Sequence, residues 1–401
     1  MQMRGKGRLR RTISWLCAGL LLLTLAVYRY QTAPLLTAVE FQEIAAHAPE
    51  VKPLTWPGYG QAAVATKDLG IVATHGETAP QSTASTAKLM TVLAIMQKKP
   101  FSDGRGETIT FTADDVARYS TYVAGNGTTA AVSARLQWTQ YQALQAILLA
   151  SANNISDTMA IWAFGSLENY REYAQEMVRK LGMNETTIGT DASGYDASTT
   201  STAHDMALLA LRVLEEPVLR DIVQQQIVTL PVAGVITNTN VLLGQDEVIG
   251  MKTGYSPEAG GVFVLAGRHS VDEHTQDIVT VVMGAPGGAS RVAQQDAYAL
   301  YASAKENFSY QQVVSSGQPI GSAVPAWAEA IPVLAKESLG MFVWSGAPIG
   351  LQLPGADIEP GSQDAGVLTV SRGEWRRDIP LTLARPIPQP NLWWRIVARG
   401  W

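Results

Sequence analysis

The first residues that could carry out chemistry together are Ser85 and Lys88, in the run Ser85-Thr86-Ala87-Lys88. Residues three apart on a helix are separated by almost one turn, so the lysine ammonium can reach the serine hydroxyl. A lysine that is removed from water has a lowered pKa, and its neutral amine can accept the serine proton. The pair therefore predicts a nucleophile, Ser85, with Lys88 as its general base.

A second polar group, Ser151-Ala152-Asn153, follows an apolar run and could serve the same reaction. Serine and asparagine are also common at helix starts, so a capping role is the structural alternative. In the catalytic interpretation, Ser151 carries a proton between Lys88 and a leaving amine. Asn153 then holds both Lys88 and a substrate amide through its donor and its acceptor.

A third group, Lys252-Thr253-Gly254, lies in a run typical of a strand and is followed by Tyr255. Lys252 would attract a substrate carboxylate and help to lower the pKa of Lys88, and Thr253 would donate a hydrogen bond to that carboxylate. Gly254, which has no side chain, would let the substrate lie against the strand edge. The three groups together predict acyl transfer on a substrate that ends in a carboxylate.

These groups need a scaffold that brings residues 85, 151 and 252 together. Apolar side chains at helical spacing predict a helix that begins at Ser85 and ends before Pro100. A helix-rich stretch follows, over about 110–225. Strand patterns occur before and after it, at 61–68, 71–76, 248–255, 260–269 and 277–286. This order predicts an α+β fold with helices on both sides of a sheet and a helical lobe, in which the sheet joins both ends of the catalytic segment.

The chain begins with a membrane signal. Its first 29 residues hold six basic side chains and no acid, and residues 12–28 are uncharged and mostly apolar. Basic residues before such a run predict a single-pass helix whose start is cytoplasmic, with everything after about residue 30 outside the cell membrane. An uncleaved anchor and a removed signal peptide both remain open, and both export the rest of the chain.

Composition shifts divide the chain further. After about residue 307, short apolar runs alternate with Gly and Pro turns, which predicts a small all-β module. The end, NLWWRIVARGW, is either a segment that docks on this module or one that lies on a membrane surface. We expect a basic start and anchor at 1–30, a linker at 31–56, a catalytic domain at 57–305, a β-rich domain at 306–385 and a Trp-rich tail at 386–401.

The net charge and the spacing of the histidines limit which molecules this chain is expected to bind. Because the whole chain carries −5 and its first 29 residues carry +6, the remainder carries −11, which argues against binding to nucleic acid. The histidines, such as His269 and His274, show no metal-binding spacing, and we expect neither a metal nor another cofactor.

The order Ser-x-x-Lys, Ser-x-Asn, Lys-Thr-Gly is typical of penicillin-binding proteins and serine β-lactamases. The sequence resembles the low-molecular-mass D-alanyl-D-alanine carboxypeptidases over nearly all of residues 57–385. The resemblance is carried by STASTAKLMTVLAIM, LLASANNISDTMA, GMKTGYSPEAGG and VVMGAP. It implies a β-lactamase-like fold, a peptidoglycan stem peptide as substrate, and β-lactams as covalent inhibitors. It also implies an oxyanion hole formed by the backbone N–H groups of Ser85 and Tyr255.

Three other functions compete with this interpretation. A DD-endopeptidase that cuts cross-linked peptides would use the same residues. A class A β-lactamase also needs a Glu-x-x-Leu-Asn element, and none lies between Asn153 and Lys252. A non-catalytic cell-wall binding protein would lack one of the motif residues, and all of them are present. The stretch 231–251 contains no arginine, so carboxylate recognition falls to Lys252 and Thr253.

Overall fold

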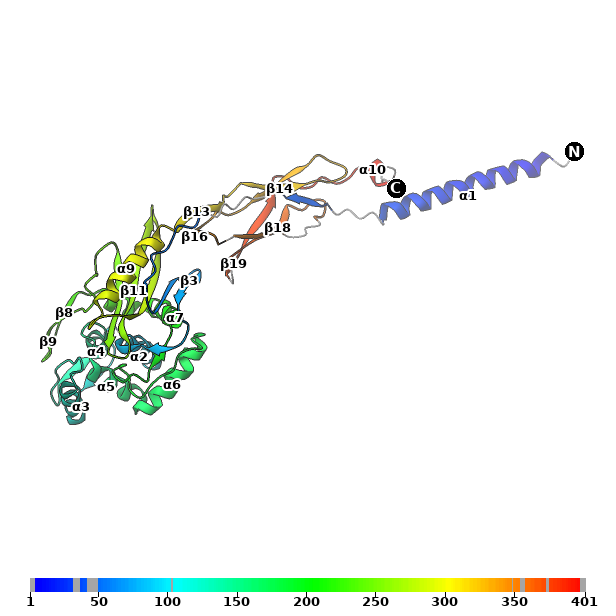
Figure 1. Ribbon diagram of the computed structural model, residues 1–401. Coiled ribbons are helices and arrows are strands. Elements are labelled where there is room, and N and C mark those ends of the chain that lie inside the picture. Colours follow the sequence, from blue (N-terminus) through cyan, green and yellow to red (C-terminus); the bar gives the residue numbers. More distant parts are fainter. Residues whose placement is uncertain are drawn as a thin grey trace. The chain divides into compact units, whose positions relative to one another are not determined.

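The computed structural model (Figure 1) describes most of the chain. The described residues are 4–31, 37–41, 50–101, 104–347, 349–353, 358–372 and 375–396, without the side chains of 4–11. Parts of the expected linker (32–36 and 42–49) and the last five residues of the expected tail lie outside them. Two compact units are present: Pro49–Tyr310 with Phe342–Gly346, and the remainder of the chain.

The larger unit, which holds all three motifs, is built on a five-stranded antiparallel sheet. Its strand order is β10 (Val248–Ser256), β11 (Gly260–Val271), β12 (His274–Ala285), β2 (Gln61–Thr66) and β3 (Gly70–Gly76). Strands from the two ends of the segment meet where β12 pairs with β2, as the sequence predicts. All six residues of β2 are buried, and side chains alternate between the faces of a sheet, so both faces are covered.

Helices supply that cover and form the lobe between the early and late strands (Figure 1). Helix α7 packs on β2 and β12, and α9 packs on β11 and β12. The predicted α+β architecture, with helices on both sides of a sheet and a helical lobe, is confirmed. The helices are η1 (Ala84–Ala87, 3-10), α2 (Lys88–Lys98), α3 (Ala113–Ala124), α4 (Gln140–Leu148), α5 (Asn153–Phe164), α6 (Leu167–Lys180), α7 (Ala203–Leu214), α8 (Pro217–Val223) and α9 (Arg291–Lys305).

The core of this unit explains the apolar spacing seen in the sequence. Leu89, Val92, Leu93 and Met96 of α2 are all buried, and α2 packs against α4, α5, α6 and α7. The helix ends at Lys98, before Pro100, as predicted. Three short strand pairs complete the unit: β4 (Gln81–Ser82) with β7 (Thr200–Ser201), β5 (Thr108–Thr110) with β6 (Gln137–Thr139), and β8 (Ile227–Leu230) with β9 (Gly234–Thr237).

The smaller unit contains a six-stranded sheet, the β-rich module that the turn-rich composition predicts. Its strand order is β1 (Val39–Phe41), β14 (Pro319–Ala323), β15 (Ile331–Ala335), β19 (Trp375–Leu383), β18 (Asp364–Arg372) and β17 (Gly350–Gln352). Strands β13 (Phe308–Val314) and β16 (Leu339–Trp344) form a separate pair. The segment expected to be a linker contributes strand β1 to this sheet. The three residues of β1 pair with β14.

The same unit includes helix α1 (Arg4–Gln31) and the short helix α10 (Leu392–Ile396) near the end of the chain. The guanidinium of Arg395 lies 4.7 Å from the ring centre of Tyr30, at the end of α1. Trp394 packs edge-on against Trp327, whose indole donates a hydrogen bond to the carbonyl of Pro388. The first part of the expected Trp-rich tail therefore contacts both the β-rich module and the end of the apolar helix.

Candidate active site

Ser85 lies in the 3-10 turn η1, immediately before α2. The preceding residue, Ala84, has φ of 43°, in the left-handed region that non-glycine residues rarely adopt. Gly194 packs directly against this turn, since a Cβ there would come within 2.0 Å of the Ala84 carbonyl oxygen. The backbone of the turn is thus tightly packed. Ser85 is nevertheless partly exposed and lines a cavity.

Lys88 is fully buried, and its Nζ contacts three oxygens. It lies 2.8 Å from Ser85 Oγ, 2.7 Å from Asn153 Oδ1 and 2.8 Å from the carbonyl oxygen of Ser193. Burial lowers the pKa of Lys88 to about 7, against the opposing effect of the Asp191 and Asp157 carboxylates. The first motif and Asn153 of the second are therefore in direct contact, around an amine whose pKa is lowered to about 7.

Lys252, Thr253 and Gly254 lie on β10, which packs against η1. Lys252 is buried, and its Nζ donates to the carbonyl of Thr253 at 3.1 Å. Burial, and after it the charge of Lys88, hold the pKa of Lys252 well below its usual value. Burial is also the cause that lowers the pKa of Lys88.

Gly254 also has a structural role that the sequence did not indicate. A Cβ at this position would lie 3.1 Å from the Thr83 carbonyl oxygen and 3.2 Å from the Ser85 nitrogen. The missing side chain therefore lets β10 approach the backbone of η1, and it does so at the Ser85 amide. The next residue, Tyr255, is partly exposed and lines the same cavity as Ser85.

Ser151 is buried, with φ of 60°, between α4 and α5. The N-cap of α5 is Ala152, which has no capping side chain, so Ser151 does not cap that helix. Within the described part of the chain, its hydroxyl forms no hydrogen bond with Lys88 or another side chain. Its role as a proton carrier stays a prediction.

Several supporting residues were not identified from the sequence. Asp191 accepts hydrogen bonds from the Ser193 and Gly194 amides at 2.8 and 2.7 Å, and Asp157 accepts one from the Ala192 amide at 2.9 Å. These bonds fix the segment whose Ser193 carbonyl contacts Lys88. The run Asp191-Ala192-Ser193-Gly194 has the composition of a side-chain-stabilised turn, which was the available signal.

Two further contacts complete this support. Tyr122 donates a hydrogen bond to the second Asp157 oxygen at 2.6 Å. On the other side of the site, the hydroxyls of Thr239 and Thr253 lie 2.7 Å apart. Neither Tyr122 nor Thr239 belongs to a motif, and no sequence pattern pointed to them.

One cavity of about 480 Å³, which we call the catalytic cleft, is lined by residues of the first two motifs and by the residue that follows the third. Ser85 belongs to the first motif and Asn153 to the second, and Tyr255 comes directly after Gly254. The other walls of the cleft are residues 125–128, 194–195 and 256–258. The arrangement places a serine hydroxyl beside a buried lysine amine at the wall of a cavity, which is compatible with acyl transfer.

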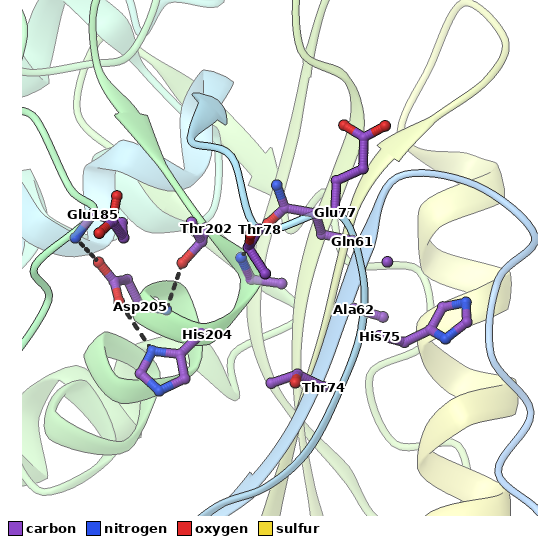
Figure 2. Close-up of a pocket in the computed structure, with 12 residues that line it drawn as sticks. Gln61, Ala62, Thr74, His75, Glu77, Thr78, Glu185, Thr202, His204 and Asp205 are labelled. Carbon is purple, nitrogen blue, oxygen red and sulfur yellow. Dashed lines mark hydrogen bonds and ion pairs between the residues drawn. The ribbon is translucent and has the colours of Figure 1, made fainter.

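A separate pocket lies away from these residues, beside β3 and α7 (Figure 2). Figure 2 shows Asp205 there, held by the Glu185 amide and by His204, each bond being 2.9–3.0 Å long. Asp205 also accepts a hydrogen bond from the Thr186 hydroxyl. Its carboxylate is thus occupied in joining α7 to the loop at residues 185–186, and none of the expected site residues lines this pocket.

Comparisons with solved structures agree with this architecture. A peptidoglycan synthesis regulatory factor (PBP3) from Streptococcus pneumoniae is 18% identical, with a TM-score of 0.63 over 84% of this chain and 100% of that one. Penicillin binding protein 6B from Escherichia coli is 19% identical, with a TM-score of 0.63 over 86% and 100%. Penicillin binding protein 5 from Haemophilus influenzae is 17% identical, with a TM-score of 0.61 over 85% and 100%.

These identities are low, so the three structures establish a shared fold. A search of curated proteins found no match. The family model described as D-alanyl-D-alanine carboxypeptidase matches residues 62–287, which is more than half of the chain and contains all three motifs. The chain therefore belongs to the D-alanyl-D-alanine carboxypeptidase family.

Proposed function

We propose that this serine-type D-Ala-D-Ala carboxypeptidase removes the terminal D-alanine from peptidoglycan stem peptides, with Ser85 forming an acyl-enzyme. The observation that carries the proposal is the environment of Lys88. A neutral lysine has two N–H groups and one lone pair. The Asn153 and Ser193 oxygens can only accept, so they bind the two N–H groups, and the lone pair faces the Ser85 hydroxyl.

This arrangement supports a complete acylation step. Ser85 Oγ attacks the carbonyl carbon of the penultimate D-alanine while its proton passes to Lys88 Nζ. The backbone N–H groups of Ser85 and Tyr255 stabilise the negative oxygen of the tetrahedral intermediate. The proton then moves to the leaving nitrogen, with Ser151 as the proposed carrier, the C–N bond breaks, and D-alanine departs.

Deacylation repeats the same proton path with water. Lys88, neutral again, accepts a proton from a water molecule that attacks the Ser85 ester, and Ser85 regains its hydrogen as the acid leaves. Before cleavage, the terminal carboxylate of the substrate would bind Lys252 and Thr253, which lie next to Gly254 on β10. A β-lactam would acylate Ser85 in the same way and act as a covalent inhibitor.

The first test is covalent labelling at Ser85. We expect a penicillin to add its mass to the peptide that contains Ser85, and we expect the parent chain to release D-alanine from a peptide ending in D-Ala-D-Ala. Ser85→Ala should lose both activities. Ser82→Ala, a serine change in the same peptide, is the matched control and should keep them. Mass spectrometry of the labelled digest provides the measurement, and an adduct that persists in Ser85→Ala would refute the assignment.

A further inference from the structure

Among the described residues that line the catalytic cleft, one has a charged side chain. It is Glu258, which is exposed and lies in the turn between β10 and β11. Within the described part of the chain, its carboxylate forms no ion pair or hydrogen bond with another side chain. The two lysines of the motifs, Lys88 and Lys252, are buried and do not line the cleft. The wall of the cleft therefore carries an unpaired negative charge.

The place of Glu258 relative to the scissile bond rests on the proposed function. The terminal carboxylate of the substrate lies at Thr253, and the scissile carbonyl oxygen lies at the Tyr255 amide. The substrate therefore runs along β10 toward the end of this strand at Ser256. A strand and an extended peptide both advance about 3.3 Å per residue. The residue that precedes D-Ala-D-Ala consequently lies beside residues 256–258.

Two tyrosines form another part of the cleft wall. Tyr195 is 46% exposed and Tyr255 is 42% exposed, and both line the cleft. The Tyr195 ring is held in place, because its hydroxyl donates to the Gly125 carbonyl and the ring packs edge-on against Tyr122, with 5.3 Å between the ring centres. Aromatic rings pack against methylene groups, and their faces attract a cation. A carboxylate with exposed rings suits an alkyl chain that ends in an ammonium group.

We propose that Glu258 binds an ammonium group on the side chain of the residue that precedes D-Ala-D-Ala, and that the enzyme therefore selects peptides in which this amine is free. The methylene groups of that side chain pack on the tyrosine rings while the ammonium group pairs with the Glu258 carboxylate. An acylated amine is neutral, so it loses the ion pair. Glu258 does not touch the reacting atoms, and the ammonium is paired equally before and during the reaction. Its effect therefore falls on KM and not on kcat.

The test compares two peptides that differ at one group. Both end in D-Ala-D-Ala preceded by lysine, whose side-chain amine is free in one peptide and acetylated in the other. We expect the parent chain to show a kcat/KM about fivefold higher for the free amine, the upper end for an ion pair that water reaches. Glu258→Gln should bring the two values together. Glu258→Lys should reverse the preference, and it should favour a third peptide in which glutamate replaces the lysine.

Glu172→Gln is the matched control, since Glu172 is exposed on α6 and does not line the cleft. It should keep the fivefold preference. If the parent releases D-alanine equally from both lysine peptides, the inference is wrong and the proposed function stands. If Glu258→Gln keeps the preference, or lowers kcat for both peptides alike, Glu258 does not recognise the ammonium and the inference is again wrong. If the parent releases D-alanine from neither peptide, the proposed function fails and the inference fails with it.

Discussion

Lys88 shows how one buried side chain acquires a reactive state. Its ammonium is removed from water, which favours the neutral form, while Asp157 and Asp191 partly restore the charged form. The balance places its pKa at about 7, so both forms are populated near neutral pH. A general base works best when its pKa is close to the operating pH, and Lys88 meets that condition.

This balance predicts the pH dependence of acylation. Only the neutral amine accepts the Ser85 proton, so the rate should rise with pH through a midpoint near 7 and then level off. Asp157→Asn keeps the shape of the side chain but removes a negative charge that raises the pKa of Lys88, so the midpoint should move to lower pH. Penicillin acylation rates between pH 5 and 9 provide the measurement.

Two controls accompany this profile. Tyr122→Phe removes the hydroxyl that donates to Asp157 but leaves the Asp157 carboxylate in place. The pH midpoint of acylation should therefore not fall in Tyr122→Phe as it does in Asp157→Asn. Lys88→Arg keeps a charge that cannot be lost at these pH values, so acylation should fall at least about 100-fold. A midpoint that stays in place in Asp157→Asn would mean that another group governs the profile.

At the scale of elements, the active site depends on the contact between η1 and β10. The two elements are about 170 residues apart in the sequence, and they approach closely because Gly254 has no side chain. The contact brings the Ser85 amide beside the strand that carries Tyr255. The proposed oxyanion hole would be formed at this junction, so its geometry depends on the separation of the two elements.

Gly254→Ala tests that separation. The added Cβ, 3.1–3.2 Å from the Thr83 oxygen and the Ser85 nitrogen, should push η1 away and misalign the Ser85 amide. We expect acylation to slow by about 10- to 100-fold. This effect is smaller than, or similar to, the drop in rate when one oxyanion-hole donor is removed. Gly58→Ala is the control, because a Cβ there has no neighbour within 4 Å. A normal acylation rate in Gly254→Ala would contradict the proposed role of the junction.

At the scale of the whole molecule, helix α1 is a candidate membrane span. Its segment Thr12–Gln31 has 20 residues with a mean hydropathy of 1.6, and none of its length is buried. At 1.5 Å per residue it extends about 30 Å, the thickness of the hydrocarbon layer of a membrane. The helix meets the requirements of length and composition for a membrane span, and we propose that it anchors the exported catalytic domain.

Deletion of residues 1–31 tests the anchor. We expect the truncated chain to move from the membrane pellet to the soluble fraction, with D-alanine release from a small peptide unchanged. Deletion of residues 392–401 is the control and should leave the protein in the membrane pellet. If the chain without residues 1–31 still sediments with membranes, the Trp-rich tail, where Trp393 is 71% exposed, is sufficient for attachment.

The sequence by itself determined the architecture and indicated which residues are candidates for the chemistry. Ser85, Lys88, Asn153, Lys252 and Thr253 were recognisable because catalysis requires particular side chains at particular spacings. The sheet strands and helix α2 were recognisable because burial requires apolar residues at a period of 2 or 3.6. Helix α1 was recognisable for a different reason: its residues form a long uncharged run, which is what a membrane span requires.

Only the tertiary structure revealed how these residues are tuned. The third partner of Lys88 is a backbone carbonyl at Ser193, and any residue type can supply a carbonyl, so no sequence pattern marks it. The roles of Asp157, Asp191 and Thr239 depend on contacts between distant segments that periodicity does not encode. The pKa of Lys88 likewise follows from its complete burial, and burial is decided by the packing of several elements around one atom.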